Sequence, residues 1–96
     1  MTGQVGVQIK FGHVLADYAG ARQASLQVPA GTTLRQLFDD LSRTQLSRWA
    51  GAQRSKGEIS AYLRIFRNGE LISPLQLDAA LVDGDELLLL PAIAGG

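Results

Sequence analysis

The 96-residue chain has no cysteine and only one histidine, His13. The missing cysteine excludes disulfides, a persulfide-bearing thiol, thiolate zinc sites and cysteine-ligated iron–sulfur clusters. A single histidine cannot form a multi-histidine metal site within the chain. The sequence therefore predicts no metal and no permanently bound cofactor, and we interpret His13 as a surface or helix-capping residue.

Charge and hydropathy exclude further classes. Nine basic residues balance nine acidic ones, so the formal net charge is +0 and no overall field attracts nucleic acid or an anionic membrane. No apolar run approaches the roughly 20 residues that span a bilayer. Residues 1–10 lack the basic stretch and apolar core of a signal peptide. We expect a cytoplasmic protein without a nucleic-acid or membrane partner.

The apolar residues that are present make up 46% of the chain, enough for one domain with one core. Apolar side chains alternate with polar ones over residues 4–11, and this period of two predicts a strand. Residues 12–23 are predicted to form a loop. Residues 25–28 alternate again and predict a second strand that returns as a hairpin partner of the first.

A helix is predicted to follow. Thr33 and Gln36 have the spacing of a capping box. One apolar stripe comes next at helical spacing: Leu34, Leu37, Phe38 and Leu41. The pattern ends near residues 45–46, and Asp39 and Asp40 are predicted to face solvent. The polar, basic segment 47–60 predicts an irregular connection in which Trp49 makes a small separate contact.

The remaining residues predict three more strands. Residues 62–67 and 70–72 flank Asn68-Gly69, a pair typical of a type I′ hairpin turn. A crossover packed by Leu75, Leu77 and Leu81 leads to a turn at 83–85 and a last strand over 86–90. This order predicts an α+β fold of the β-grasp type, with one main helix on one face of a mixed sheet and the first and last strands central.

The chain closes on Gly95-Gly96, directly after the last predicted strand. Glycines leave the backbone unobstructed and free to adopt many conformations, so such a terminus can thread a narrow channel. We therefore divide the chain into a domain over 1–90 and a tail over 91–96. The tail consists of Pro91, Ala92, Ile93, Ala94, Gly95 and Gly96. Fully extended, it reaches about 20 Å.

Alternation along the last strand predicts a docking surface. If Leu87 and Leu89 face the helix-covered core, Leu88 and Leu90 lie on the opposite, open face of the sheet. The third strand adds residues by the same rule: Tyr62, Arg64 and Phe66. Apolar side chains gathered on an uncovered face are typical of a partner site. The alternative is that a loop covers them.

Residues 28–34, 83–86 and 90–96 together resemble the MoaD/ThiS family of ubiquitin-like sulfur carriers. The tail, with proline and a terminal Gly-Gly, is most similar to the small subunit of molybdopterin synthase. The basic segment 47–60 is longer than a minimal member needs. The resemblance covers nearly the whole chain.

The resemblance implies a chemistry for the terminus. An ATP-using, E1-like enzyme would adenylate the Gly96 carboxylate, and sulfur would then replace AMP to give a thiocarboxylate. Catalytic side chains would reside on the partners, the adenylating enzyme and the large subunit of molybdopterin synthase, so the chain is no catalyst alone. Three alternatives stay open: a carrier for cysteine, thiamine or tRNA thiolation, a modifier conjugated to proteins through Gly96, and a plain β-grasp interaction module.

Overall fold

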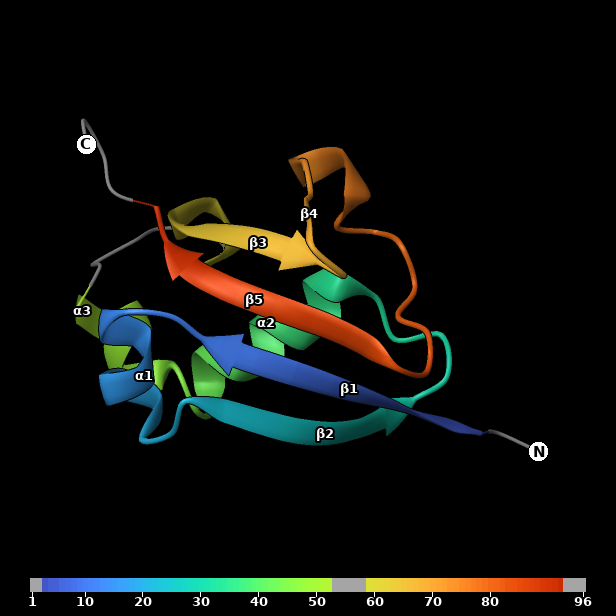
Figure 1. Ribbon diagram of the computed structural model, residues 1–96, viewed down its shortest axis with the longest axis horizontal. Coiled ribbons are helices and arrows are strands. Elements are labelled where there is room, and N and C mark those ends of the chain that lie inside the picture. Colours follow the sequence, from blue (N-terminus) through green and yellow to red (C-terminus); the bar gives the residue numbers. More distant parts are fainter. Residues whose placement is uncertain (1–2, 53–58, 93–96) are drawn as a thin grey trace.

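The computed structural model describes residues 3–52 and 59–92. Five strands form one sheet in the order β2-β1-β5-β3-β4. The strands are β1 (Gln4–Phe11), β2 (Gln23–Pro29), β3 (Leu63–Arg67), β4 (Glu70–Leu71) and β5 (Asp85–Pro91). The helices are α1 (Val14–Ala19), α2 (Leu34–Arg43) and α3 (Ser47–Ala52), with short 3₁₀ turns η1 (Ile59–Tyr62) and η2 (Pro74–Gln76). Figure 1 shows α2 crossing one face of the sheet.

The sheet has the predicted β-grasp topology. β1 pairs antiparallel with β2 and parallel with β5, so the first and last strands lie next to each other inside the sheet. β5 pairs antiparallel with β3, which pairs with β4 through the Asn68-Gly69 turn. Both turn residues have positive φ, 52° and 87°, as the predicted type I′ turn requires. β4 ends at Leu71, one residue earlier than predicted.

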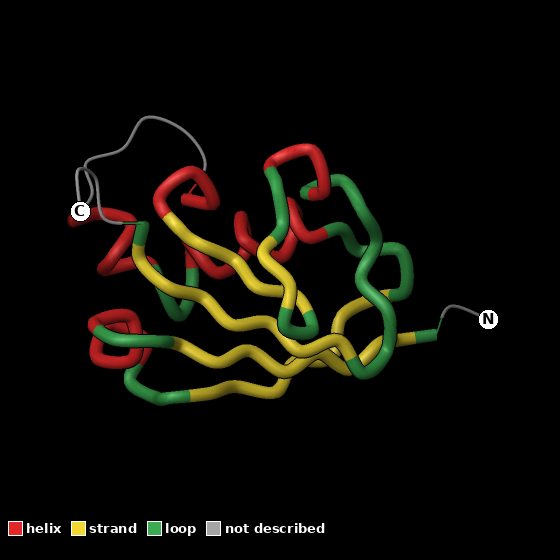
Figure 2. The backbone as a smooth tube through the Cα atoms, turned by 45° about the horizontal axis from the view of Figure 1, so that its top comes forward, coloured by secondary structure: helices red, strands yellow, loops and turns green. Residues whose placement is uncertain are grey.

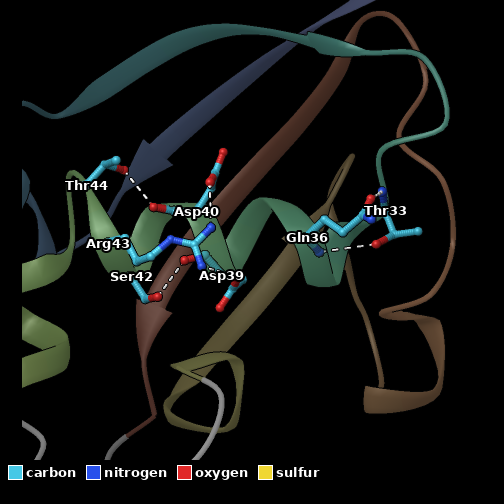
Figure 3. A network of polar contacts seen from close by, with 7 residues as sticks. All are labelled: Thr33, Gln36, Asp39, Asp40, Ser42, Arg43 and Thr44. Atoms are coloured by element: carbon cyan, nitrogen blue, oxygen red, sulfur yellow. Dashed lines mark hydrogen bonds and ion pairs between the residues drawn. The ribbon is translucent and has the colours of Figure 1, made fainter.

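The core lies between α2 and the sheet. The buried stripe of α2 is the predicted one, Leu34, Leu37, Phe38 and Leu41. The capping box is also confirmed, because the Gln36 amide donates to Thr33 Oγ1 at 3.2 Å and the Thr33 amide donates to Gln36 Oε1 at 3.0 Å (Figure 3). α2 ends at Arg43, two residues before the predicted end.

The outer side of α2 is a solvent-exposed ion-pair network, as predicted for Asp39 and Asp40. Arg43 donates to Asp39 at 2.6 Å and to Asp40 at 3.0 Å (Figure 3). The hydrogen bond to Asp40, followed by the interactions with Asp39, raises the pKa of Arg43 above its ordinary value. The two carboxylates are therefore held by one guanidinium and do not form a catalytic pair.

Two helices replace predicted irregular segments. α1 lies inside the predicted loop 12–23, buries Leu15 and is capped at its C-terminus by Gly20, whose φ is 76°. α3 lies inside the predicted connection 47–60, of which residues 53–58 lie outside the described residues. Trp49 on α3 is only 3% exposed and belongs to the main core, so the prediction of a small separate contact is wrong.

The crossover between β4 and β5 is anchored by two of the three predicted leucines. Leu77 and Leu81 are buried, whereas Leu75 is 92% exposed and does not pack against the core. The turn before β5 is present, and Gly84 has a φ of 89°. No helix within residues 3–52 and 59–92 is long and apolar enough to cross a membrane.

Asp85, at the start of β5, is a buried carboxylate that joins the crossover to the hairpin. It is 1% exposed and accepts hydrogen bonds from Arg67 (2.7 Å), Asn68 (3.1 Å) and the Val82 amide (2.9 Å). Burial alone would raise the pKa of Asp85, but the Arg67, Val82 and Asn68 hydrogen bonds outweigh burial and hold it below its ordinary value.

Candidate functional site

The site begins where β5 leaves the sheet. Pro91 is the last residue of β5 and pairs with Leu63, and the Ala92 amide donates to the Tyr62 carbonyl at 2.9 Å. Pro91 and Ala92, the first two residues of the predicted tail, therefore lie against the sheet. The pairing extends two residues beyond the predicted boundary at residue 90. The predicted threading residues Ile93, Ala94, Gly95 and Gly96 lie outside the described residues.

The open face of the sheet carries the predicted apolar cluster. Leu88 pairs with Phe66 on one side and with Lys10 on the other, and Leu90 pairs with Arg64. Leu88, Leu90 and Phe66 are half-buried and Arg64 is exposed, whereas Leu87 and Leu89 are buried in the core. The predicted alternation of β5 is thus confirmed. The role of this face in binding a partner remains a prediction.

The residues on this face differ from the predicted set at two positions, Tyr62 and Leu71. Tyr62 lies in η1 before β3, and its side chain packs against the main core, so the prediction that it joins the face as a strand residue is wrong. Leu71 pairs with Phe66 and is 55% exposed, which adds an apolar side chain that the sequence reasoning missed. Leu71 could have been predicted from the Asn68-Gly69 turn, because a two-residue hairpin places residues 66 and 71 opposite each other.

A cleft of about 520 Å³ lies beside the start of the tail. Its lining comes from His13, Val14, Trp49, Arg64, Leu90, Pro91 and Ala92. Leu90 reaches the cleft because Gly12 lacks a side chain. A Cβ added at Gly12 would lie 2.2 Å from Leu90 Cδ2, and the Gly12 amide donates to the Leu89 carbonyl at 2.9 Å. Gly12, His13 and Val14 were not predicted to meet the tail, because the segment after β1 was interpreted as a loop.

The lining of this cleft is mostly apolar, and its ionisable residues are His13 and Arg64. Neither forms an ion pair with a carboxylate of the described residues. Among the described residues, no three His, Asp or Glu side chains gather in a way that could hold a metal ion. Within residues 3–52 and 59–92 the arrangement is an apolar face beside the point where β5 ends.

Known proteins with this fold include archaeal and bacterial relatives. A sequence model of the ThiS family matches residues 9–96. Small archaeal modifier protein 1 from Haloferax volcanii is 30% identical over 82 residues, which cover 85% of this chain and 91% of the relative. The crystal structure of that protein aligns with a TM-score of 0.68, covering 95% of this chain and 99% of that chain.

Two further structures extend the comparison. The solution structure of the Haloferax volcanii HVO 2177 protein has a TM-score of 0.77 at 24% identity, covers 98% of this chain and 89% of that one, and shows the fold alone. A complex of subunits 1 and 2 of the molybdopterin-converting factor from Helicobacter pylori contains a chain with a TM-score of 0.57 at 25% identity. That alignment covers 96% of this chain and 100% of the other. The sequence match to the family thus spans the open face of the sheet and residues 93–96.

Proposed function

Because this chain belongs to the ThiS family of ubiquitin-like β-grasp proteins, we propose that it carries sulfur as a thiocarboxylate on Gly96. In this proposal it serves in the cytoplasm as the small subunit of molybdopterin synthase. The observation that carries the proposal is the family match, which runs from β1 through the Gly-Gly end. The Helicobacter pylori complex, in which a similar chain is paired with a second subunit, supports the choice of pathway.

The chemistry needs two partner-catalysed steps. A carboxylate is an anion at neutral pH and a poor electrophile. Attack of a Gly96 carboxylate oxygen on the α-phosphorus of ATP releases pyrophosphate and leaves an acyl-adenylate. A hydrosulfide equivalent then attacks the carbonyl carbon, and AMP leaves with the electrons of the broken C–O bond. The resulting thiocarboxylate is a soft nucleophile formed without any cysteine of this chain.

The described residues include a surface to which partners would bind. Leu88, Leu90, Phe66 and Leu71 form an apolar cluster on the uncovered face, next to the point where β5 ends. A partner covering this cluster would bury apolar surface and at the same time receive the chain end in its active site. In this proposal the chain supplies the sulfur-bearing group, and the partner supplies the catalytic side chains.

A second function is favoured by one observation. Small archaeal modifier protein 1, at 30% identity, carries the word modifier in its name. If this chain acts in that way, an amine of a target protein would attack the carbonyl carbon of the Gly96 acyl-adenylate, so that an amide bond forms and AMP leaves. Both functions share the adenylation step and differ only in the nucleophile that displaces AMP.

Intact-mass spectrometry separates these functions. The chain is incubated with its adenylating enzyme, ATP and a sulfide source, with an ATP-free reaction as control. We expect a species heavier by the difference between a sulfur and an oxygen atom, and its transfer of sulfur when the large subunit and precursor are added. Stable covalent adducts with other proteins, formed in cells and resistant to thiols, would favour the modifier. If neither product forms with an enzyme active on another carrier, the proposal is wrong.

The tail itself can be tested with matched variants. Gly95→Val should lower the rate of ATP–pyrophosphate exchange, because a branched side chain obstructs an extended terminus in a narrow channel. Ala94→Gly is the control and should exchange at the wild-type rate. Deletion of Gly96 should abolish exchange. Melting temperatures of all three should match the wild type. Wild-type exchange by Gly95→Val would remove the channel argument.

A further inference from the structure

The net charge of zero conceals a separation of charge along the sheet. Figure 1 shows that β1 and β5 both run toward the end of the molecule where α1 and α3 lie, here named the tail end. The tubes of Figure 2 show the turns and the crossover gathered at the opposite end, here named the loop end. β5 begins at Asp85 in the loop end and finishes at Pro91 in the tail end.

The tail end is positive. Among the described residues its unpaired charges are Lys10, Arg22, Arg48 and Arg64, against one carboxylate, Asp17, while Arg43 at the adjoining end of α2 is bonded to Asp39 and Asp40. All four cations are exposed, and none forms an ion pair within the described part of the chain. Arg48 is held over the Tyr18 ring at 5.9 Å, and Arg64 lines the cleft beside the start of the tail.

The loop end is negative. Its carboxylates are Glu70, Asp78, Asp83, Asp85 and Glu86, against two arginines, Arg35 and Arg67. Both arginines are already bonded to aspartates of the same end, Arg35 to Asp78 at 2.9 Å and Arg67 to Asp85 at 2.7 Å. Among the described side chains the loop end therefore carries a net charge of −3 and the tail end, with the Arg43, Asp39 and Asp40 group counted, a net charge of +2, and the unpaired cations lie around the start of the tail.

We propose that this positive end docks on an acidic surface around the opening of the adenylating enzyme's active site, and that the charge separation turns the tail toward that opening during encounter. The inference rests on the proposed function. Complementary charges at the edge of an interface mainly raise the association rate. The described cations adjoin the apolar cluster: Lys10 pairs with Leu88, and Arg64 with Leu90. This mixture fits a protein surface with an apolar centre and an acidic rim.

The experiment measures kcat/KM for ATP–pyrophosphate exchange by the adenylating enzyme of the same organism, as a function of salt. The test variant is Arg48→Gln/Arg64→Gln. The control is Arg35→Gln, which removes one guanidinium that is bonded to Asp78 at the loop end. A second double variant, Arg48→Gln/Arg64→Lys, keeps the charge at position 64. It tests whether charge alone restores kcat/KM.

At low salt we expect the double variant to lose about tenfold in kcat/KM with little change in kcat, since steering acts on encounter. The loss should disappear near 1 M salt, where the Debye length is about 3 Å. Arg35→Gln should have the wild-type kcat/KM, and Arg48→Gln/Arg64→Lys should have a higher kcat/KM than Arg48→Gln/Arg64→Gln. A merely structural role for the arginines would produce a loss that salt does not remove.

Several outcomes would overturn the inference. A loss that salt does not remove, or an equal loss in Arg35→Gln, would show that the location of the charge is irrelevant. Normal exchange by the wild type would in that case leave the proposed function intact. Binding of a single-stranded oligonucleotide at physiological salt that the double variant loses would assign the positive end to nucleic acid. Absence of exchange by the wild type at every salt concentration would overturn the inference together with the proposed function.

Discussion

His13 holds an unusual backbone conformation beside the chain end. Its φ of 53° and ψ of −133° lie in a region that favours glycine, and its side chain forms no cap hydrogen bond with α1. Such a conformation costs of order 1–3 kcal/mol in a residue with a side chain. The fold therefore retains strain in the lining of the cleft next to Leu90.

Relief of this strain is measurable. We expect His13→Gly to raise the free energy of unfolding by roughly 1 kcal/mol in urea denaturation. Asn68→Gly is the contrasting variant: its φ is also positive, but its side chain bonds Asp85 at 3.1 Å and the Glu86 amide at 3.0 Å, so its replacement should lower the free energy of unfolding. A destabilised His13→Gly variant would indicate that the histidine side chain, rather than its backbone, stabilises α1.

At the scale of single elements, β5 separates stability from binding along its length. Leu89→Ala should lower the free energy of unfolding by roughly 2–5 kcal/mol, because a cavity forms in the core. Leu88→Arg should change unfolding little, since this side chain is half-buried on the open face, but it should weaken capture of the adenylating enzyme. Urea denaturation and a pull-down measure the two effects. Equal destabilisation by both variants would contradict the assignment of faces.

The elements that could be predicted from sequence are those with strong periodicity or turn chemistry. β1, α2 and the hairpin at Asn68-Gly69 follow from alternation, a capping box and a residue pair. α1 and α3 could not be predicted in this way, because each has only six residues and one buried side chain. Short helices gain stability from tertiary packing and not from their own sequence. Gly20, placed after α1, was the one local signal.

The candidate site could be predicted from the sequence only in part. The faces of β5 follow from a period of two, so Leu88 and Leu90 were placed correctly. The cleft was not, because it depends on α1 and on the close approach of Leu90 to Gly12, which joins segments far apart in the chain. The separation of charge likewise appears only when strands and helices are arranged in space.

For the molecule as a whole, Asp85 couples the sheet to the crossover. It joins β5 to Arg67 of β3, to the turn at Asn68 and to the backbone of Val82. Arg67 also donates to the Ala80 carbonyl at 3.0 Å. The Arg67–Asp85 ion pair therefore connects β3 and β5 to the crossover at residues 80 and 82. Loss of the Asp85 charge should therefore loosen the whole fold and not one element.

This coupling predicts a dependence of stability on acid. Because the pKa of Asp85 is lower in the folded chain than in the unfolded one, folding favours the charged form, so its contribution is present above about pH 4 and is lost as pH falls through the folded pKa. Asp85→Asn should lower the free energy of unfolding by about 2 kcal/mol at neutral pH. The difference in free energy of unfolding between this variant and the wild type, measured by urea denaturation, should become smaller below about pH 4. Asp78→Asn, at an exposed ion pair, should show a smaller gap throughout. A gap for Asp85→Asn that stays constant with pH would mean that its carboxylate stabilises the fold by shape and not by charge.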